Sequence, residues 1–398
     1  MKILFVLGSF FPAQCGGPSN TIYWQAKSLV EEGHDVTVAT LEVGINEELQ
    51  DQYSIEFNRV HNLDGMKVYY FEYQTSPYLC CRLFRWLWKN VAEFELISLT
   101  SVFFPITWLA AVVSKIHGVP FCIAPRGELE EGALRYRSLK KKLFWACGLR
   151  WLFSRAHFVM VTCQQERIQC ERYFAAGMAI RLLPNFIDLT ARKLRPDEIA
   201  NKSGVLFLGR LHPIKAVDSL ISAFGMLPEA LARTNPLTIA GSGEETVERK
   251  LREQATHSPR AQYIRFIGHL DGPVKDEEYA SSRVFVLPSH SENFGNVVLE
   301  ALCQSTPVVA SVHTPWRQLE SANCGAWVKN DPGTLARTLE AILSLRGDDY
   351  AELAREAYKL AESFSIQKNR ESISRAFCIT LTSAQEGTVR SEDASRLE

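Results

Sequence analysis

Short apolar runs that alternate with helical patterns constrain the fold of this chain more than any other feature. The first run, Lys2–Leu7, is followed by a loop that contains Gly16 and Gly17. Apolar residues at helical spacing come next, Gly33 ends that pattern, and Val36–Thr40 forms a second apolar run. Strand, glycine loop, helix and strand in this order predict a βαβ unit, and therefore a parallel sheet buried on both faces.

The pattern recurs in two sets, and 398 residues are long for a single hydrophobic core. The first set continues with the runs Glu95–Leu99, Phe121–Ala124 and Phe158–Thr162. The second set consists of Val205–Leu208, Leu237–Ala240, Ile264–Phe266, Val284–Leu287 and Pro307–Ala310. The expected fold class is therefore α/β, with two doubly wound, Rossmann-like domains that face each other across a cleft and bind ligands at the carboxyl ends of their strands.

The domain boundaries are expected where the pattern is interrupted. We expect an N-terminal domain over residues 1–184, a polar, proline-containing linker over 185–203 and a C-terminal domain over 204–365. An amphipathic helix over 366–382 is expected to pack back on the N-terminal domain. Residues 383–398 are polar and charged, which predicts a disordered tail.

Composition limits the partners and the compartment. The formal net charge of -1 gives no overall field toward nucleic acid, so no nucleic-acid partner is expected. Ten cysteines without paired or metal-like spacing predict free thiols in a reducing, cytoplasmic compartment. No secretory signal is recognised at the start of the chain, and the longest other apolar stretch, Val102–Val113, contains Pro105 and is too short to span a bilayer.

Two glutamates flank the start of a helix after the run Val284–Leu287. Glu292 and Glu300 are eight positions apart, with Gly295 between them. A glycine allows close approach of the backbone to a ligand, and carboxylates accept hydrogen bonds from sugar hydroxyl groups. The alternative is structural: Glu292 would cap the helix and Glu300 would lie on its surface.

A basic turn comes after the run Val205–Leu208. It reads Gly209-Arg210-Leu211-His212-Pro213-Ile214-Lys215 and leads into a helix. Arg210 offers a fork of donors, Lys215 a point charge, and the start of the helix a partial positive charge. Two cations at the end of a strand therefore predict a diphosphate site, against the alternative of two solvated side chains.

Together these segments resemble the retaining glycosyltransferases of family 4, which have the GT-B fold. Glu292 and Glu300 match the E-x7-E motif of that family, and Gly209 through Lys215 match its G-R-L-x-x-x-K segment. Further similarity lies in the Gly16-Gly17 loop, in residues 33–38, and in a P-N-x-x-D segment with Asn185 and Asp188. The resemblance extends over about residues 1–377 and is weakest over 41–93.

The resemblance implies roles for residues at matching positions. The implied catalytic residues are Glu292, Arg210 and Lys215. The implied donor site consists of Gly17, Arg210, Lys215, Gly241, Gly268, His269, Leu270, Glu292, Asn293, Phe294, Gly295, Val298 and Glu300. In this assignment Arg210 and Lys215 hold the diphosphate, Glu300 the ribose hydroxyls and Glu292 the donor sugar.

Two positions depart from the family pattern. Arg126 stands where many relatives have a histidine, so no catalytic histidine is assigned, and Ala216 replaces the usual glycine after the phosphate lysine. Arg126 and Glu128 are candidates for the acceptor side, although an exposed charged loop explains them equally well. No cofactor and no metal is expected, because Arg210 and Lys215 can neutralise the leaving diphosphate.

Basic and aromatic residues are interleaved in two places. Residues 135–155 are rich in Lys, Arg, Phe and Trp, and Arg82, Arg85 and Lys89 are interleaved with further aromatic residues. Such segments suit contact with an anionic membrane surface, but an ordinary amphipathic helix has the same pattern.

The expected function is transfer of a sugar from a nucleotide-diphosphate sugar to a hydroxyl group, with retention of anomeric configuration. The acceptor would be a saccharide or a lipid-linked saccharide in lipopolysaccharide, O-antigen or exopolysaccharide assembly. Two alternatives remain open: a non-catalytic sugar-nucleotide-binding protein, and an NAD-dependent oxidoreductase. The second would need a complete G-x-G-x-x-G turn, and Gly241-Ser242-Gly243 is an incomplete match.

Overall fold

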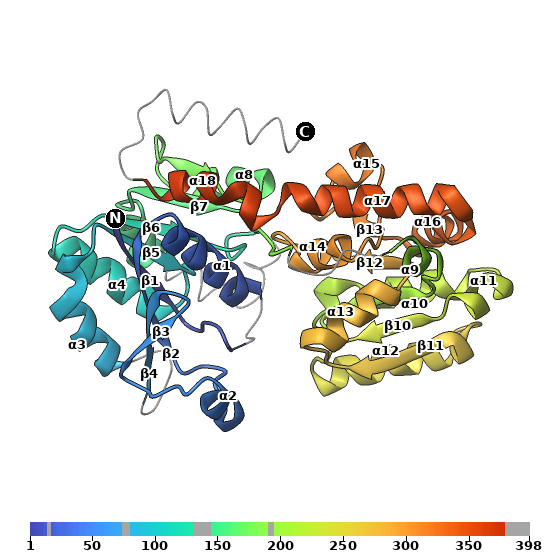
Figure 1. Cartoon of the computed structure of the whole chain (residues 1–398), viewed down its shortest axis with the longest axis horizontal. Coiled ribbons are helices and arrows are strands. Elements are labelled where there is room, and N and C mark those ends of the chain that lie inside the picture. The colour runs from blue at the N-terminus through green and yellow to red at the C-terminus, as the bar shows by residue number, and fades with distance from the viewer. Residues whose placement is uncertain (14–16, 74–79, 131–144, 190–194, 379–398) are drawn as a thin grey trace. The chain divides into compact units, whose positions relative to one another are not determined.

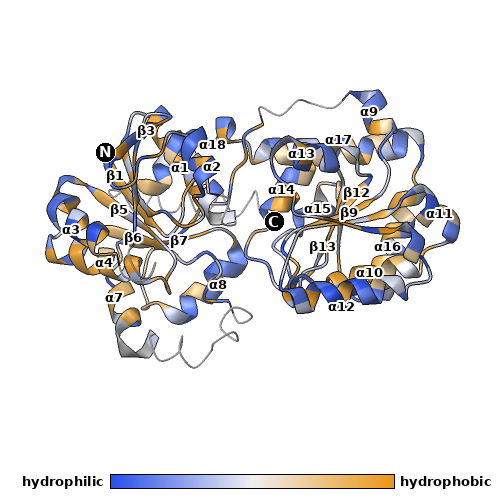
Figure 2. Ribbon diagram, turned by 90° about the horizontal axis from the view of Figure 1, so that it is seen from below, coloured by the Kyte–Doolittle hydropathy of each residue, from blue (hydrophilic) through white to orange (hydrophobic). Residues whose placement is uncertain are grey.

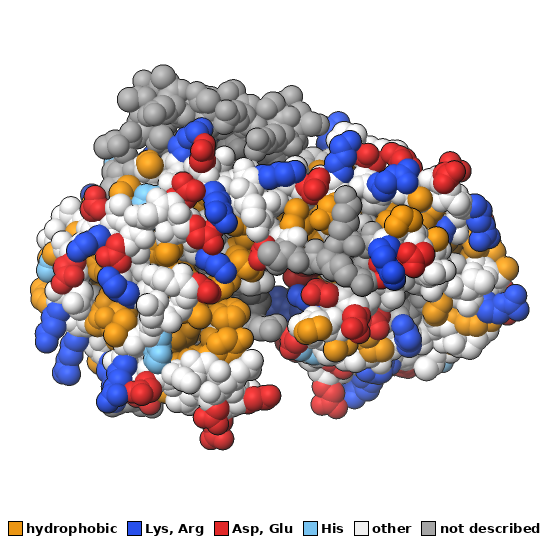
Figure 3. All heavy atoms as spheres, in the orientation of Figure 1, with side chains coloured by type: hydrophobic (Ala, Val, Ile, Leu, Met, Phe, Trp, Pro, Cys, Tyr) orange, Lys and Arg blue, Asp and Glu red, His pale blue; other side chains and the backbone are white. Residues whose placement is uncertain are grey.

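The computed structural model describes residues 1–13, 17–73, 80–130, 145–189 and 195–378. The described residues divide into two compact units, one formed by Met1–Phe186 with residues 369–378, the other by Ile187–Lys368. Each unit is built on one sheet flanked by helices (Figure 1). Lys, Arg, Asp and Glu are interspersed over the visible face of each unit (Figure 3), as expected for a chain of nearly zero net charge.

The first unit contains an eight-stranded sheet in the order β3-β4-β2-β1-β5-β6-β7-β8. Its strands are β1 (Lys2–Leu7), β2 (Asp35–Leu41), β3 (Val60–Leu63), β4 (Met66–Phe71), β5 (Leu96–Thr100), β6 (Phe121–Ala124), β7 (Phe158–Val161) and β8 (Ile180–Leu182). All neighbouring strands are parallel except β3 and β4. These two form an edge hairpin around Asp64-Gly65, both with positive φ, which the sequence reasoning missed.

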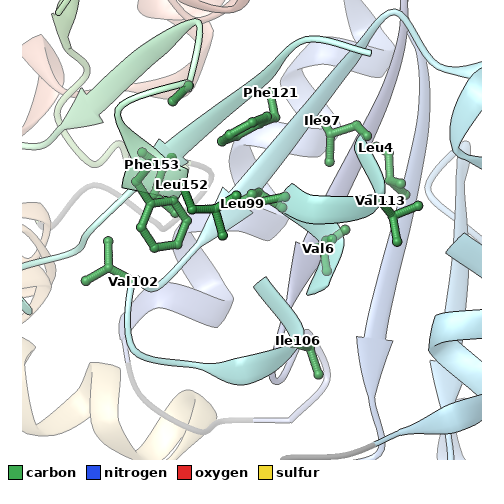
Figure 4. Close-up of a cluster of buried hydrophobic side chains, with 14 of the residues drawn as sticks. Leu4, Val6, Ile97, Leu99, Val102, Ile106, Val113, Phe121, Leu152 and Phe153 are labelled. Atoms are coloured by element: carbon green, nitrogen blue, oxygen red, sulfur yellow. The ribbon is translucent and has the colours of Figure 1, made fainter. Parts of the chain in front are cut away.

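Alternation of side chains along the strands gives the first sheet two buried faces. One face packs against α3 (Cys81–Asn90), α4 (Pro105–Ile116) and α7 (Arg150–Phe153). Figure 4 shows part of this cluster, with Leu4, Val6, Ile97, Leu99, Ile106, Val113, Leu152 and Phe153. The other face packs against α1 (Gly17–Glu31) and α18 (Ile366–Phe377).

The helix expected at 366–382 is α18, and its final part contacts the first sheet. The rings of Phe377 and Phe5 lie 5.5 Å apart, and Arg181 Nη1 donates to the carbonyl oxygens of Ala376 and Cys378. The segment expected as a disordered tail, residues 383–398, lies outside the described residues. The remaining helical elements of this unit are α2 (Glu47–Gln52), η1 (Val91–Glu93), η2 (Trp145–Leu149) and α8 (Gln164–Tyr173).

The second unit contains a six-stranded parallel sheet in the order β11-β10-β9-β12-β13-β14. The strands are β9 (Val205–Leu208), β10 (Leu237–Ala240), β11 (Ile264–Gly268), β12 (Val284–Leu287), β13 (Val308–Ser311) and β14 (Gly325–Val328). Numbered within the unit, this order is 3-2-1-4-5-6, the doubly wound arrangement. All strands are parallel, and the order in which successive strands are added reverses between the first and the fourth strand. The strand β14 was not expected from the sequence.

Helices cover both faces of the second sheet. One buried cluster includes residues of α10 (Val217–Gly225), α12 (Glu245–Thr256) and α16 (Pro332–Ser344). The other includes residues of α13 (Gly272–Ser281), α14 (Asn296–Cys303) and α17 (Gly347–Ser363). The remaining helical elements are α9 (Pro196–Ala200), η3 (Pro213–Lys215), α11 (Glu229–Thr234), η4 (Ala261–Tyr263) and α15 (Gln318–Ser321).

The segment 185–203, expected as a linker, is structured in its second half. It contains α9, whose Ile199 packs against Tyr350 and Ala354. A linker would have few contacts with either domain. Because α9 packs on the second unit through Ile199, this half of the segment belongs to that unit. Residues 190–194 lie outside the described part.

Candidate donor site at the edge of the second sheet

The two candidate motifs come after the two strands between which the second sheet reverses direction. Arg210 and Lys215 come after β9, and Glu292 comes after β12, which is the direct neighbour of β9. The carboxyl ends of parallel strands meet at one edge, and ligands of doubly wound sheets bind where the strand order reverses. The fold therefore brings both motifs to the position where a ligand site is expected.

The basic turn presents one paired and one unpaired cation. The Lys215 ammonium group forms an ion pair with the Glu292 carboxylate. Only 17% of the Lys215 side chain and 15% of the Glu292 side chain are exposed, so this pair is largely shielded from water. The Arg210 side chain is exposed and has no ion pair or hydrogen bond within the described part of the chain. It is therefore available to an anionic ligand.

The loop after β12 is held against the basic turn by its backbone. The main-chain N–H of His290 donates to the carbonyl oxygen of Ile214 at 2.7 Å. Ser289 Oγ donates to the Glu292 carboxylate at 3.4 Å, and Asn330 Nδ2 donates to the carbonyl oxygen of Pro288 at 2.8 Å. These contacts within the protein hold Glu292 beside Lys215.

Gly295 caps the helix α14 in a conformation that requires glycine. Its φ is +83°, and an added Cβ would lie 3.1 Å from both Glu292 Cγ and Leu287 Cδ2. The adjacent Phe294 ring is buried against Trp316 and Phe364, with ring centroids 5.2 and 6.1 Å away. Phe294 can therefore meet a ligand only through its main chain.

The predicted donor residues Asn293 and Val298 flank this turn. Val298 is fully buried in the cluster beneath α14, so its side chain contributes packing. Asn293 lies in the loop before Gly295 and is partly buried.

Glu300 lies in the second turn of α14 and is oriented by two side chains of α13. Lys275 Nζ donates to one carboxylate oxygen at 3.1 Å, and the Tyr279 hydroxyl donates to the other at 2.9 Å. Burial, followed by the charge of Glu300, raises the pKa of Tyr279 well above its ordinary value, so the phenol stays protonated. Each carboxylate oxygen retains a further lone pair for a ligand hydroxyl group.

Sequence reasoning missed Lys275 and Tyr279. The two residues are four positions apart and so lie on one face of α13. That spacing was a usable signal for a pair, but only the packing of α13 beside α14 shows that the pair meets Glu300.

Gly241 and Gly243 allow the loops after β9 and β10 to touch through their backbones. A Cβ on Gly241 would lie 1.9 Å from the Gly209 carbonyl oxygen, and one on Gly243 would lie 2.0 Å from the Leu211 carbonyl oxygen. The Leu211 N–H donates to the Ser242 carbonyl oxygen at 2.9 Å. The loop after β10 therefore tolerates only glycine at the two positions that touch the neighbours of Arg210.

The loop after β11 carries the other predicted base-side residues. Gly268 has a φ of +77° and its carbonyl oxygen accepts from the Gly241 N–H at 2.6 Å. His269 is largely exposed, with its Nε2 atom 3.0 Å from an Asp271 oxygen, whereas Leu270 packs against the cluster beneath α14. The loops after β9, β10 and β11 are thus joined by hydrogen bonds at one edge of the sheet.

In the first unit, Arg126 lies just after β6 in a left-handed conformation with a φ of +53°. Its Nη1 donates to Asn185 Oδ1 at 3.0 Å and its Nη2 to Gln25 Oε1 at 3.2 Å. Burial lowers the pKa of the guanidinium, and the nearby carboxylate of Glu166 opposes that shift. Two neutral amides therefore hold this cation in place.

Glu128 is engaged with the loop between β5 and α4. Its carboxylate accepts hydrogen bonds from Ser101 Oγ and from the main-chain N–H groups of Val102 and Phe103, at distances of 2.6–3.1 Å. Ser101 has a φ of +82°, so this carboxylate supports an unfavourable backbone conformation. The structure gives Glu128 a role in positioning the loop.

The remaining predicted features are Gly17, the basic segment and the expected absence of a membrane span or metal site. Gly17 is exposed at the start of α1, and its carbonyl oxygen accepts from Thr21 Oγ1 at 3.0 Å. The basic segment 135–155 is described only from Trp145 onward. In the part of the chain that is described, no helix has the length and apolar character needed to cross a bilayer, and no group of three or more His, Cys, Asp or Glu residues could hold a metal ion.

Comparison with known proteins assigns the chain to a family. The model of the glycosyl transferase 4-like domain matches residues 16–185, and the model of glycosyl transferases group 1 matches residues 192–360. The two models together match most of the chain. The chain belongs to glycosyltransferase family 4. Membership of this family argues against the oxidoreductase alternative.

Relatives of this family 4 glycosyltransferase are similar over limited stretches. It is 29% identical over 233 residues to the D-inositol 3-phosphate glycosyltransferase of Geodermatophilus obscurus. This matched stretch covers 54% of this chain and 51% of that protein. It is 30% identical over 164 residues to the O-antigen chain mannosyltransferase B of Escherichia coli, covering 40% and 42%. The chain thus spans about half or less of the length of these relatives.

The fold is confirmed by solved structures. The structure of Anabaena HepE in complex with UDP and glucose matches with a TM-score of 0.73 over 94% of this chain and 98% of that one, at 19% identity. At this identity the likeness shows the fold alone. The prediction of the GT-B class, with two parallel-sheet α/β domains, is therefore confirmed.

Proposed function

We propose that this chain transfers a sugar from a nucleotide-diphosphate sugar to a hydroxyl group of an acceptor, with retention of anomeric configuration. The observation that carries the proposal is the arrangement of Arg210, Lys215, Glu292 and Glu300 around the reversal point of the second sheet. Both carboxylates are paired with a lysine, and Arg210 has no partner among the described residues. The net charge of this group therefore suits a diphosphate.

Each residue has a distinct task in this proposal. Arg210 binds the diphosphate through its fork of donors, and Lys215 joins it. An ammonium group has three donors, so Lys215 can hold Glu292 and a phosphate oxygen at the same time. The main chain of Asn293, Phe294 and Gly295 at the start of α14 supplies further donors, together with the partial positive charge of the helix.

The carboxylates would recognise hydroxyl groups. Glu300 accepts hydrogen bonds from the two ribose hydroxyls with the lone pairs that Lys275 and Tyr279 leave free. Glu292 accepts from a hydroxyl group of the donor sugar with the lone pairs that its ion pair with Lys215 leaves free. The loops with Gly241, Gly268, His269 and Leu270 flank the nucleotide base.

Transfer requires no nucleophile from the protein. The bond between the anomeric carbon and the β-phosphate oxygen breaks while the acceptor oxygen bonds to the same face of that carbon. The acceptor proton passes to the departing phosphate oxygen. Arg210 and Lys215 stabilise the negative charge that develops on the diphosphate, so this task falls to protein cations and to no metal.

The acceptor would be a saccharide or a lipid-linked saccharide used in lipopolysaccharide, O-antigen or exopolysaccharide assembly. The name of the Escherichia coli relative, an O-antigen chain mannosyltransferase, supports this class. Arg126 lies at the carboxyl edge of the first sheet, the edge at which a parallel sheet binds ligands, and we assign it to the acceptor side. Glu128 supports the neighbouring loop and would contribute indirectly.

A thermal shift screen against UDP, GDP, ADP and their sugar conjugates tests donor binding. A ligand at a hundred times its dissociation constant stabilises the fold by about 2.7 kcal/mol. Arg210→Ala and Glu300→Ala should each weaken binding of the responding nucleotide by about 1.5–3 kcal/mol, the value of a hydrogen bond to a charged group. Glu300→Gln keeps the volume and provides a second variant should the alanine form unfold.

Arg249→Ala is the matched control, because Arg249 is an exposed cation on α12 of the same unit. Full donor affinity in both site variants would refute the assignment of the site. Release of free sugar from the responding donor by the purified protein would exclude the alternative of a non-catalytic sugar-nucleotide-binding protein.

A further inference from the structure

Three helices of the first unit expose large apolar side chains. Phe84 and Trp88 of α3 are 37% and 45% exposed, Val112 and Ile116 of α4 are 42% and 60% exposed, and Trp151 of α7 is 56% exposed. None of these residues is needed for the core, which α3, α4 and α7 reach through other, buried residues such as Leu83, Leu87, Ile106, Val113, Leu152 and Phe153. In Figure 2 the three helices lie together along one side of the first unit.

The exposed side chains form one continuous surface. Phe84 and Trp88 are one turn apart, with ring centroids at 6.0 Å, and Trp88 meets the ring of His117 edge-on at 5.2 Å. His117 comes directly after Ile116 at the end of α4, and α4 contacts both α3 and α7. We call this surface the α3–α4–α7 face, defined by Phe84, Trp88, Val112, Ile116 and Trp151 with the exposed cations of the same helices.

The charge of this face has one sign. The helices α3, α4 and α7 contain no Asp or Glu, and their cations together with the following Arg155 are Arg82, Arg85, Lys89, Lys115, Arg150 and Arg155. Among these cations, Arg82 forms an ion pair with Glu72. The nearest acidic residues in sequence are Glu93 and Glu95 after α3, and Glu95 binds the start of β1.

Two of these cations share one indole ring. Lys115 Nζ lies 4.0 Å from the centroid of the Trp151 ring, and the Arg155 guanidinium carbon lies 3.6 Å from it. Partial desolvation, followed by repulsion from Arg155, lowers the pKa of Lys115. An external anion would relieve this repulsion, because the protein places no carboxylate of α3, α4 or α7 there.

We propose that the α3–α4–α7 face docks on the surface of an anionic lipid bilayer. Tryptophan and phenylalanine suit the boundary between headgroups and acyl chains, and lysine and arginine beside them are attracted by the negative surface potential. A second copy of the chain is a poorer occupant. A two-fold contact through this face would set the same cations against one another.

This inference does not depend on the proposed transfer reaction, although a lipid-linked acceptor would be found at the same membrane. The test uses the full chain and co-sedimentation with vesicles of phosphatidylcholine alone or of equal parts phosphatidylcholine and phosphatidylglycerol. The wild type should partition onto the anionic vesicles and not onto the neutral ones, and added salt should weaken that binding.

Two variants of the face and two matched controls locate the contact. Trp88→Ala with Trp151→Ala removes apolar contact, and Arg85→Glu with Lys89→Glu reverses two charges. Each cation near an anionic surface raises the membrane-binding constant about fivefold. The charge variant should therefore bind the anionic vesicles at least on the order of twentyfold more weakly. Met226→Ala with Val274→Ala, and Arg249→Glu with Lys250→Glu, alter exposed residues of the second unit and should bind as the wild type.

Each result has a clear meaning. No binding by the wild type, or equal binding by wild type and both face variants, overturns the proposal. A dimer in light scattering that the face variants abolish would also overturn it, because the face would then be a contact between copies. The face variants should keep the thermal shift with the donor nucleotide, so failure here and failure of the proposed function are separate outcomes.

Discussion

The contact between the loops after β9 and β10 makes Gly243 a sensitive test of how Arg210 is positioned. Gly243 forms an isolated parallel bridge with Leu211, the residue after Arg210. A Cβ at Gly243 would lie 2.0 Å from the Leu211 carbonyl oxygen and 2.8 Å from its carbonyl carbon. The obstructing atoms belong to the backbone, so a change of side-chain rotamer cannot relieve the overlap. We therefore predict that Gly243→Ala forces the two loops apart.

The structure sets the size of the effect. Ordinary contact begins at 3.4 Å, so a Cβ only 2.0 Å from the carbonyl oxygen requires the loops to move apart by about 1.4 Å. Such a movement would break the 2.9 Å hydrogen bond from the Leu211 N–H to the Ser242 carbonyl oxygen. The lost hydrogen bond contributes about 1 kcal/mol and the overpacking about 1–3 kcal/mol. The free energy of unfolding should fall by about 2–4 kcal/mol.

Donor binding should fall with it, because Arg210 directly precedes Leu211, the residue that the added methyl group would displace. A displacement of about 1 Å is enough to weaken a charge-assisted hydrogen bond, for a loss of about tenfold or more in affinity. The assays are urea unfolding, with hydrogen exchange read out for β9 and β10, and titration with the nucleotide that stabilises the wild type. Gly333→Ala is the control, since the nearest atom to a Cβ there is 3.6 Å away. An unfolding midpoint and donor affinity for Gly243→Ala equal to those of Gly333→Ala would refute this account of the loops.

Two further predictions concern charged side chains outside the candidate donor site. Glu128→Gln should lower the free energy of unfolding by about 1.5–3 kcal/mol, because a carboxylate that accepts three hydrogen bonds is lost. Donor affinity should stay unchanged. An unaltered melting temperature with reduced sugar transfer would instead make Glu128 an acceptor-binding group. Burial lowers the pKa of Lys202 from 10.5 to about 7. Between these two pH values the unfolded state binds more protons than the folded state. The contribution of the Lys202 side chain to stability is therefore full above pH 10.5 and lost as the pH falls through 7. The wild type should therefore gain stability relative to Lys202→Met between neutral pH and about pH 9.5 in urea titrations, and parallel pH dependences of the two proteins would contradict this.

The apolar runs in the sequence correctly predicted that the two candidate motifs follow the strands β9 and β12. Strands buried on both faces of a parallel sheet are apolar throughout, so β1, β9, β10 and β12 could be recognised without tertiary information. Arg210, Lys215 and Glu292 come soon after such strands, and the carboxyl ends of parallel strands share one edge. Their individual roles stay predictions until donor binding is measured.

Edge strands were harder to predict. The pair β3 and β4 has the alternating or partly exposed pattern of a hairpin at the edge of a sheet, and β8 is only three residues long with Arg181 at its centre. Asp64-Gly65 was a recognisable turn signal between β3 and β4. Local patterns at an edge are weak because one side of the strand has no neighbour and fewer residues must be apolar.

The amino-acid sequence by itself determined the class of fold, the two units and the residue types at the donor edge, because these depend on local periodicity and on the residues directly after each strand. Only the tertiary structure decided which charges meet. The pairing of Lys215 with Glu292, the orientation of Glu300 by Lys275 and Tyr279, and the union of α3, α4 and α7 into one face all join segments separated in the chain. Such contacts depend on strand order and helix packing, and local sequence patterns do not encode either of them residue by residue.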